Sequence, residues 1–152
     1  MKTIIDIAIE SEGWPDYETL AAQAVEAVSA ELESPREGEL SLVLSNDAQV
    51  QVLNKTYRDK DKPTNVLSFP QTGALLGDIV LARETISREA AEKKISFEAH
   101  VTHLIIHGWL HLQGFDHLTD ETAAEMESIE ISALATLSIC LLYTSPSPRD
   151  RG

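Results

Sequence analysis

Cysteine is nearly absent from this chain of 152 residues, in which Cys140 is the single example. One thiol can build neither an intrachain disulfide framework nor a zinc cluster of thiolates, which suits a reducing compartment. Long apolar runs are lacking too, since residues 131–143 are too few to span a bilayer and include polar side chains. The first ten residues do not resemble a secretion signal, because Asp6 interrupts their apolar part, so we expect none. We therefore expect a cytoplasmic protein with no membrane partner.

Basic residues are scarce as well. The chain has 12 lysines and arginines against 25 aspartates and glutamates, which gives a formal net charge of -13. A protein that coats nucleic acid non-specifically attracts phosphate through a broad excess of positive charge. The composition therefore excludes general nucleic-acid coating, and we expect no DNA partner. Any site for a polyanion must be local.

The length and the 43% hydrophobic content fit one globular domain, which we place at residues 1–139. Alternating apolar residues predict strands, and apolar residues at helical spacing predict helices. The expected strands are 3–10, 40–45, 66–69 and 76–82, and the expected helices are 16–32, 47–57, 84–94, 97–113 and one that begins near Thr119. Four strands and about five helices in this order indicate an α/β (α+β) fold.

Residues 140–152 do not continue this pattern. CLLYTSPSPRD, at residues 140–150, has no turn or cap that would connect it to the preceding helix. It resembles the translation of a transposon-end sequencing adapter, so we expect a non-native or disordered tail in which Cys140 has no biological meaning. A natural disordered tail rich in serine and proline is the alternative.

Three of the five histidines fall within HGWLHLQGFDH, at residues 107–117. A spacing of four places His107 and His111 on one helical face, within reach of a single metal ion. Gly114 can adopt the left-handed conformation that ends a helix, so that His117 can turn back toward the same ion. Three imidazoles would leave a tetrahedral zinc with one open position, as in catalytic sites. The alternative is a chance grouping of core or surface histidines, and the agreement of these features favours the metal.

The neighbouring residues have simpler interpretations. His103 continues the same helical face one turn earlier and is expected to pack or to support a ligand. His100 is expected to be exposed, and Trp109 to pack rather than to stack on a base. Asp116 could orient a ligand or accept a proton, although such a carboxylate caps a turn at least as often.

The same zincin-like His-x3-His-x5-His spacing occurs in metzincin proteases, where a glutamate directly after the first histidine acts as general base. In this chain that position is Gly108. The spacing of a zincin is therefore present without its base, which argues against a zinc metallopeptidase.

HGWLHLQGFDH matches the pattern H-G-x-L-H-L-x-G-[YF]-D-H of the YbeY family, which are bacterial single-strand-specific endoribonucleases of ribosomal RNA maturation and ribosome quality control. Two further segments, LNKTYRDKDKPTNVLSFP at 53–70 and LGDIVLA at 76–82, resemble the other hallmarks of that family. The resemblance covers residues 1 to about 137, and the tail is where the chain departs from the family.

The resemblance implies a small four-stranded mixed sheet with helices around it. It also implies a zinc-dependent endoribonuclease of 16S 3′-end maturation, with single-stranded ribosomal RNA as substrate and the ribosome or ribosomal proteins as partners. The implied zinc ligands are His107, His111 and His117, with one Zn2+ per chain, although another first-row metal is possible. His107 and Arg58 are the implied catalytic residues.

The second segment makes chemical sense for RNA because it is locally basic. Its cations outnumber its anions, with Lys55, Arg58, Lys60 and Lys62 against Asp59 and Asp61. Arg58 can give two parallel hydrogen bonds to phosphate oxygens and stabilise the charge of the transition state. Lys55 and Lys62 are candidate substrate-binding residues, although a solvated loop is the simpler interpretation for Lys60 and Lys62 taken singly.

Three functions stay open at this point: a metal-dependent endoribonuclease, a metallopeptidase or other zinc hydrolase, and a ribosome-associated protein whose zinc is structural. For the endoribonuclease, the nucleophile is either a zinc-bound water or the RNA 2′-hydroxyl.

Overall fold

The computed structural model describes residues 4–60, 62, 64–116 and 118–137. His117 and residues 140–152 lie outside these ranges, so the predictions made for them concern residues that the structure does not describe. The strands are β1 (Ile4–Ile9), β2 (Glu39–Ser45), β3 (Val66–Pro70) and β4 (Leu75–Ala82), and the helices are α1 (Glu18–Ser29), α2 (Asp47–Arg58), α3 (Arg83–Lys93), α4 (Phe97–Leu112) and α5 (Asp120–Thr136). Within the described ranges, the predicted α/β order of four strands and five helices is confirmed.

The strands form one mixed sheet in the order β1-β2-β4-β3. β1, β2 and β4 run parallel, whereas β3 runs antiparallel to β4. In this order the antiparallel strand β3 lies at one edge of the sheet, where it pairs with β4. This edge strand carries the end of the basic segment that sequence analysis singled out.

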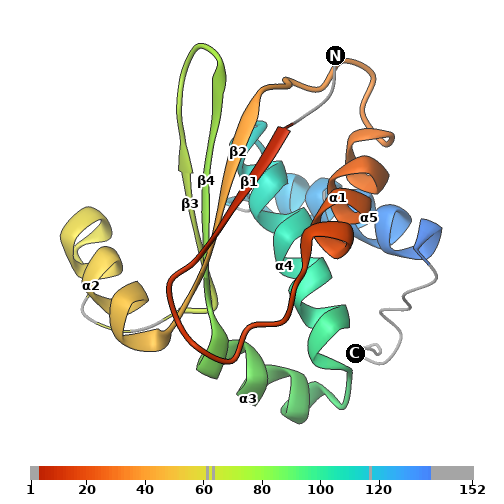
Figure 1. Cartoon of the computed structure of the whole chain (residues 1–152). Coiled ribbons are helices and arrows are strands. Elements are labelled where there is room, and N and C mark those ends of the chain that lie inside the picture. The colour runs from red at the N-terminus through yellow and green to blue at the C-terminus, as the bar shows by residue number, and fades with distance from the viewer. Residues whose placement is uncertain (1–3, 61, 63, 117, 138–152) are drawn as a thin grey trace.

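The helices cover the two faces of the sheet unequally. Figure 1 shows α2 alone on one face, and α1, α4 and α5 together on the other. Alternation along β2 explains the division, since Leu40, Leu42 and Leu44 are fully buried in the main core, whereas Val43 packs into a small second core beneath α2. The main core therefore lies between the sheet and the helix that carries the histidines.

α4 is the most buried of these helices. Ser96 caps its start by accepting a hydrogen bond from the backbone of Ala99, and Gly114 follows its end with a φ of +100°. The predicted glycine stop is therefore confirmed, and so is the packing role of Trp109, which is fully buried. Among the described residues, no helix is both long and apolar enough to cross a bilayer.

The prediction that His100 is exposed is wrong, because only 1% of its surface is accessible. Its Nε2 lies 2.8 Å from the Oε1 atom of Glu89 on α3. The same oxygen accepts a hydrogen bond from the side chain of Asn65 at 2.9 Å. A polar partner supplied by a neighbouring helix thus allows a histidine to be buried, which the pattern along α4 alone does not indicate.

Candidate active site

The rings of His107 and His111 lie side by side on one face of α4. Their Nε2 atoms are 3.1 Å apart, and the ring centroids are 4.6 Å apart with planes at 84°. The helical spacing that predicted this pairing therefore brings two imidazole nitrogens to one point.

Each of the two rings is held through its other nitrogen. Nδ1 of His107 lies 2.6 Å from Oε2 of Glu130, and Nδ1 of His111 lies 3.0 Å from the backbone oxygen of Phe115. A carboxylate and a carbonyl only accept hydrogen bonds, so each Nδ1 donates, and in the neutral form of either ring the lone pair is then at Nε2. Imidazole ligands of metal ions are held in this way in proteins.

With both rings in the neutral form, their Nε2 lone pairs face each other across 3.1 Å and repel unless a positive charge lies between them. Two nitrogen ligands of a tetrahedral zinc, each about 2.0–2.1 Å from the ion, are themselves separated by about 3.3 Å. The donor atoms and the spacing of His107 and His111 therefore fit a first-row metal ion such as zinc.

The third expected ligand, His117, lies outside the described residues. Among the residues that the structure does describe, no group of three or more histidine, cysteine, aspartate or glutamate side chains is arranged to hold a metal ion. The adjacent Asp116 makes the turn-capping contact, since its Oδ1 accepts a hydrogen bond from the backbone of Leu118 at 3.2 Å.

Glu130 on α5 is a residue that sequence reasoning missed. It is 6% exposed, and it contacts His103 as well as His107. Burial alone would raise the pKa of this carboxyl, but the hydrogen bonds from His103 and His107 lower it to about 2. The sequence does contain a signal that could have identified Glu130. It is a carboxylate on the apolar stripe of α5, one turn after the buried Met126 and one turn before the buried Leu134, where a charged side chain is unusual without a partner.

Arg58 lies in the last turn of α2 and reaches the edge strand. Its Nη2 donates to the backbone oxygen of Ser68 at 3.0 Å, and its Cζ lies 5.9 Å from the centroid of the Phe69 ring. The side chain of Ser68 lies near α4, because a Cβ placed on Gly108 would be 3.0 Å from its Oγ. Ser68 therefore connects the arginine to the helix that carries His107.

The same geometry explains the glycine at position 108. A Cβ there would also lie 3.1 Å from Cδ1 of Ile79 in β4, so the absence of a side chain lets α4 pack closely on the sheet. The position that holds the general base in metzincins is used here for packing, which strengthens the argument against peptidase chemistry.

The basic segment lines a cavity of about 400 Å³ between the loop after α2, β3 and α3. Its cationic lining residues are Arg58, Lys60 and Lys62, and Asn65 and Glu89 lie among the others. The buried amide of Asn54 donates to the backbone oxygen of Lys62 at 2.9 Å and so holds this loop. Lys55, which lies on α2 one turn before Arg58, is exposed. The cavity has the size and the charge to accept a phosphate group.

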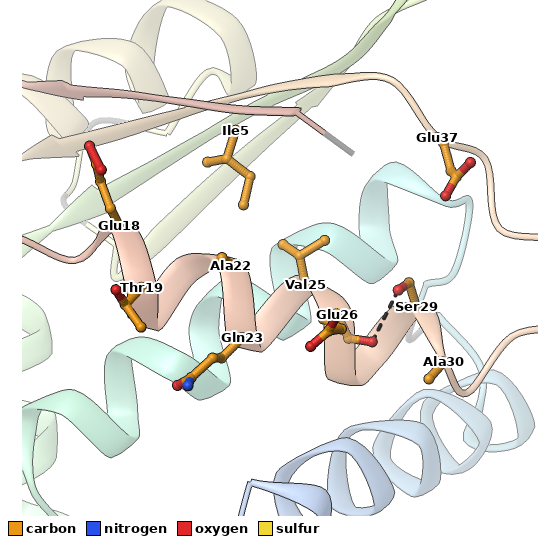
Figure 2. A pocket seen from close by; sticks show the side chains of 10 residues that line it. All are labelled: Ile5, Glu18, Thr19, Ala22, Gln23, Val25, Glu26, Ser29, Ala30 and Glu37. Carbon is orange, nitrogen blue, oxygen red and sulfur yellow. Dashed lines mark hydrogen bonds between the residues drawn. The ribbon is translucent and has the colours of Figure 1, made fainter. Parts of the chain in front are cut away.

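A larger cavity of about 660 Å³ lies beside α1 and has the opposite character. Figure 2 shows Glu18, Glu26 and Glu37 among its lining side chains, together with Ile5 of β1. Three carboxylates repel a polyanion, so this cavity does not suit a nucleic-acid phosphate.

Known proteins are similar to this chain over most of its length. The family model described as Endoribonuclease YbeY matches residues 6–138. The protein named Endoribonuclease YbeY from Agrobacterium fabrum is 46% identical, over 95% of this chain and 96% of its own length. The protein of that name from Sphingopyxis alaskensis is 47% identical, over 86% of this chain and 91% of its own length. The solution structure of TM1509 from Thermotoga maritima is 26% identical, with a TM-score of 0.60 over 89% of this chain and 92% of that one.

Proposed function

Because the chain belongs to the Endoribonuclease YbeY family, we propose that it is a metal-dependent endoribonuclease that hydrolyses phosphodiester bonds in single-stranded RNA. The observation that carries the metal dependence is the pair of Nε2 atoms of His107 and His111, which lie 3.1 Å apart and are both oriented through Nδ1. Zinc fits these donors, and another first-row metal is the alternative.

In this proposal His107, His111 and His117 hold one metal ion per chain. A metal ion bound by these residues would supply Lewis acidity for the hydrolysis of the phosphodiester. His107 and His111 contribute neutral nitrogens, which requires that their Nδ1 protons stay directed at Glu130 and Phe115. His107 belongs to the proposed catalytic set as a ligand whose orientation would fix the position of the metal ion.

Arg58 is the proposed partner of the phosphate. A guanidinium has five N–H donors, of which Ser68 engages one through its carbonyl oxygen, so the group can bind phosphate oxygens while its plane is held. Lys62 and Lys60 line the same cavity and would contact flanking phosphates, whereas the exposed Lys55 would attract RNA at longer range. Binding of flanking phosphates and transition-state stabilisation are thus both assigned to the basic segment that lines this cavity.

The cellular role that we propose is maturation of the 3′ end of 16S ribosomal RNA and ribosome quality control in the cytoplasm, with the ribosome or ribosomal proteins as partners. Membership of the family supports this role. The net charge of -13 also supports a partner, because an acidic enzyme repels RNA at long range and gains from delivery by a basic protein.

The proposal is tested by incubating the purified protein with single-stranded ribosomal RNA and with a matched duplex, with and without a chelator. We expect cleavage of the single strand alone, loss of cleavage with chelator, and recovery when zinc is added back. Metal analysis should give about one zinc per chain, and the double variant His107→Ala/His111→Ala should lose it.

Two results would contradict the proposal. Cleavage that persists in chelator would exclude the metal from the chemistry. A protein that loses its fold with chelator and never cuts RNA would instead show a structural zinc.

A further inference from the structure

Glu130 is clamped at both of its carboxylate oxygens by histidines of α4. Oε1 lies 2.9 Å from Nε2 of His103, and Oε2 lies 2.6 Å from Nδ1 of His107. The two histidines occupy consecutive turns of α4, with ring centroids 6.5 Å apart, and the carboxylate reaches them from α5. One buried side chain therefore contacts a proposed metal ligand and a histidine that is not a proposed ligand.

This contact decides where the protons of the two rings lie. An ionised carboxylate has no proton to donate, so His103 must donate through Nε2 and His107 through Nδ1. The lone pair of His107 is then on Nε2, which is the atom that faces His111. A proton on Nε2 of His107 would remove that lone pair and would leave a buried carboxylate oxygen without its donor, which is costly.

His107 and His111, the two proposed ligands that the structure describes, differ in how they are held. Nδ1 of His111 donates to the backbone oxygen of Phe115, a partner that no side-chain substitution removes. Nδ1 of His107 depends on one side chain that lies outside the histidine motif and on another helix. We infer that Glu130 is a positioning residue that keeps His107 in the tautomer required for metal binding, with His103 as its second anchor; this inference rests on the proposed metal site.

A purely structural role, in which Glu130 only joins α5 to α4, would also make its removal destabilising. The tautomers of His103 and His107 distinguish this structural role from the proposed positioning role. A glutamine at position 130 has one oxygen that accepts and one NH2 group that donates, so it can satisfy both rings only if one of them changes tautomer. Zinc binding requires His107 to keep its Nδ1 proton, so His103 must be the ring that changes.

The experiment compares the unaltered protein with Glu130→Gln and Glu130→Leu. Zinc affinity is measured by competition with a chelator, and the tautomers are read from the 15N chemical shifts of the histidine side chains. We expect Glu130→Leu to lower zinc affinity by about 10- to 100-fold, as is typical when the partner of a ligating histidine is lost, and Glu130→Gln to lower it less. In zinc-bound Glu130→Gln, His103 should carry its proton on Nδ1, whereas in the unaltered protein it carries it on Nε2.

Glu127→Gln is the matched control, because Glu127 is an exposed carboxylate on the same helix, and it should change neither readout. Wild-type zinc affinity in both Glu130 variants, or a proton on Nε2 of His107 in the unaltered protein, would overturn the inference. If the unaltered protein binds no zinc, the proposed function fails, but the tautomer of His107 with and without Glu130→Gln still tests the role of Glu130. If Glu130→Leu does not fold, Glu130→Gln and the tautomers of the unaltered protein decide the matter.

Discussion

Arg58 differs from the neighbouring lysines because its charged group has fixed neighbours. The carbonyl of Ser68 accepts from Nη2, and the ring of Phe69 lies beneath the guanidinium at 5.9 Å. Together these contacts hold the guanidinium plane, which favours a two-point contact with phosphate. A lysine at this position would keep the charge and lose the plane.

We therefore predict that Arg58→Lys lowers the rate of RNA cleavage nearly as much as Arg58→Ala, by on the order of 100-fold or more, because each variant loses a donor to the transition state. Single-turnover cleavage of a single-stranded oligonucleotide measures the rate, and zinc content and circular dichroism should stay unchanged. Lys93→Gln removes an exposed charge from α3 and is the control. Cleavage by Arg58→Lys close to the wild-type rate would mean that Arg58 acts only through its charge.

His100 makes the stability of the fold depend on pH. Burial lowers its pKa below the ordinary value of 6.5, the hydrogen bond with Glu89 opposes this, and the charge of Lys93 and the nearby His103 lower it further. Below about pH 6.5, His100 takes up a proton in the unfolded chain more readily than in the folded chain, where its pKa is lower. Since the unfolded state then binds more protons, the contribution of His100 to stability is present above pH 6.5 and is lost as the pH falls.

We predict that the difference in free energy of unfolding between the unaltered protein and His100→Asn is smaller at pH 5.5 than at pH 7.5. Urea denaturation of both proteins at the two pH values provides the measurement. The comparison cancels the titration of histidines that both proteins share. A difference that grows on acidification would show instead that protonated His100 forms a stabilising ion pair with Glu89.

At the scale of elements, the hairpin of β3 and β4 packs closely on the end of α4. A Cβ on Gly77 would lie 2.6 Å from the backbone oxygen of Phe69 and 2.6 Å from Cδ2 of Leu112. Gly77 also has a φ of +154°, a conformation that side chains disfavour. This glycine therefore lets β4 approach both its partner strand and the helix that carries the histidines.

We predict that Gly77→Ala lowers the free energy of unfolding by about 2 kcal/mol or more, because backbone strain and overpacking act together. Gly73→Ala is the matched control in the loop of the same hairpin. Gly73 has a φ of +70°, and a Cβ added there would meet nothing within 4 Å, so its substitution should cost only about 1 kcal/mol of strain. Equal losses in thermal denaturation would contradict the packing argument.

At the scale of the whole molecule, negative charge predominates, and the cavity beside β3 is lined by a small group of cations. The net charge is -13, whereas Arg58, Lys60 and Lys62 line one cavity. Only a few phosphates can then be neutralised when RNA binds. Added salt also screens the repulsion between the acidic protein surface and the rest of the RNA strand. This effect opposes the loss of affinity that salt causes at the cavity.

We predict that affinity for a single-stranded oligonucleotide falls only shallowly with salt. At about −0.7 per phosphate, three cations would give a slope of about −2 in a plot of log affinity against log salt concentration. A titration of binding by fluorescence anisotropy measures the slope. A slope about twice as steep would show that RNA contacts extend well beyond this cavity.

The sequence by itself determined the features that depend on short spacings. Alternation in residues 40–45 indicated a strand, the four-residue step from His107 to His111 predicted adjacent rings, and Gly114 predicted the end of the helix. The motif and the two further segments were enough to indicate the family. Such features are set by the fixed periods of helices and strands, so they can be predicted without knowing what packs against them.

Only the tertiary structure decided which distant groups meet. Glu130 lies 23 positions after His107 in the chain and still contacts its ring, His100 is buried because Glu89 of another helix reaches it, and Arg58 is held by the carbonyl of an edge strand. Whether a polar side chain is buried depends on the partner that a second element brings, because burial without a partner is costly. That partner is chosen by the packing of whole elements, which no local period encodes.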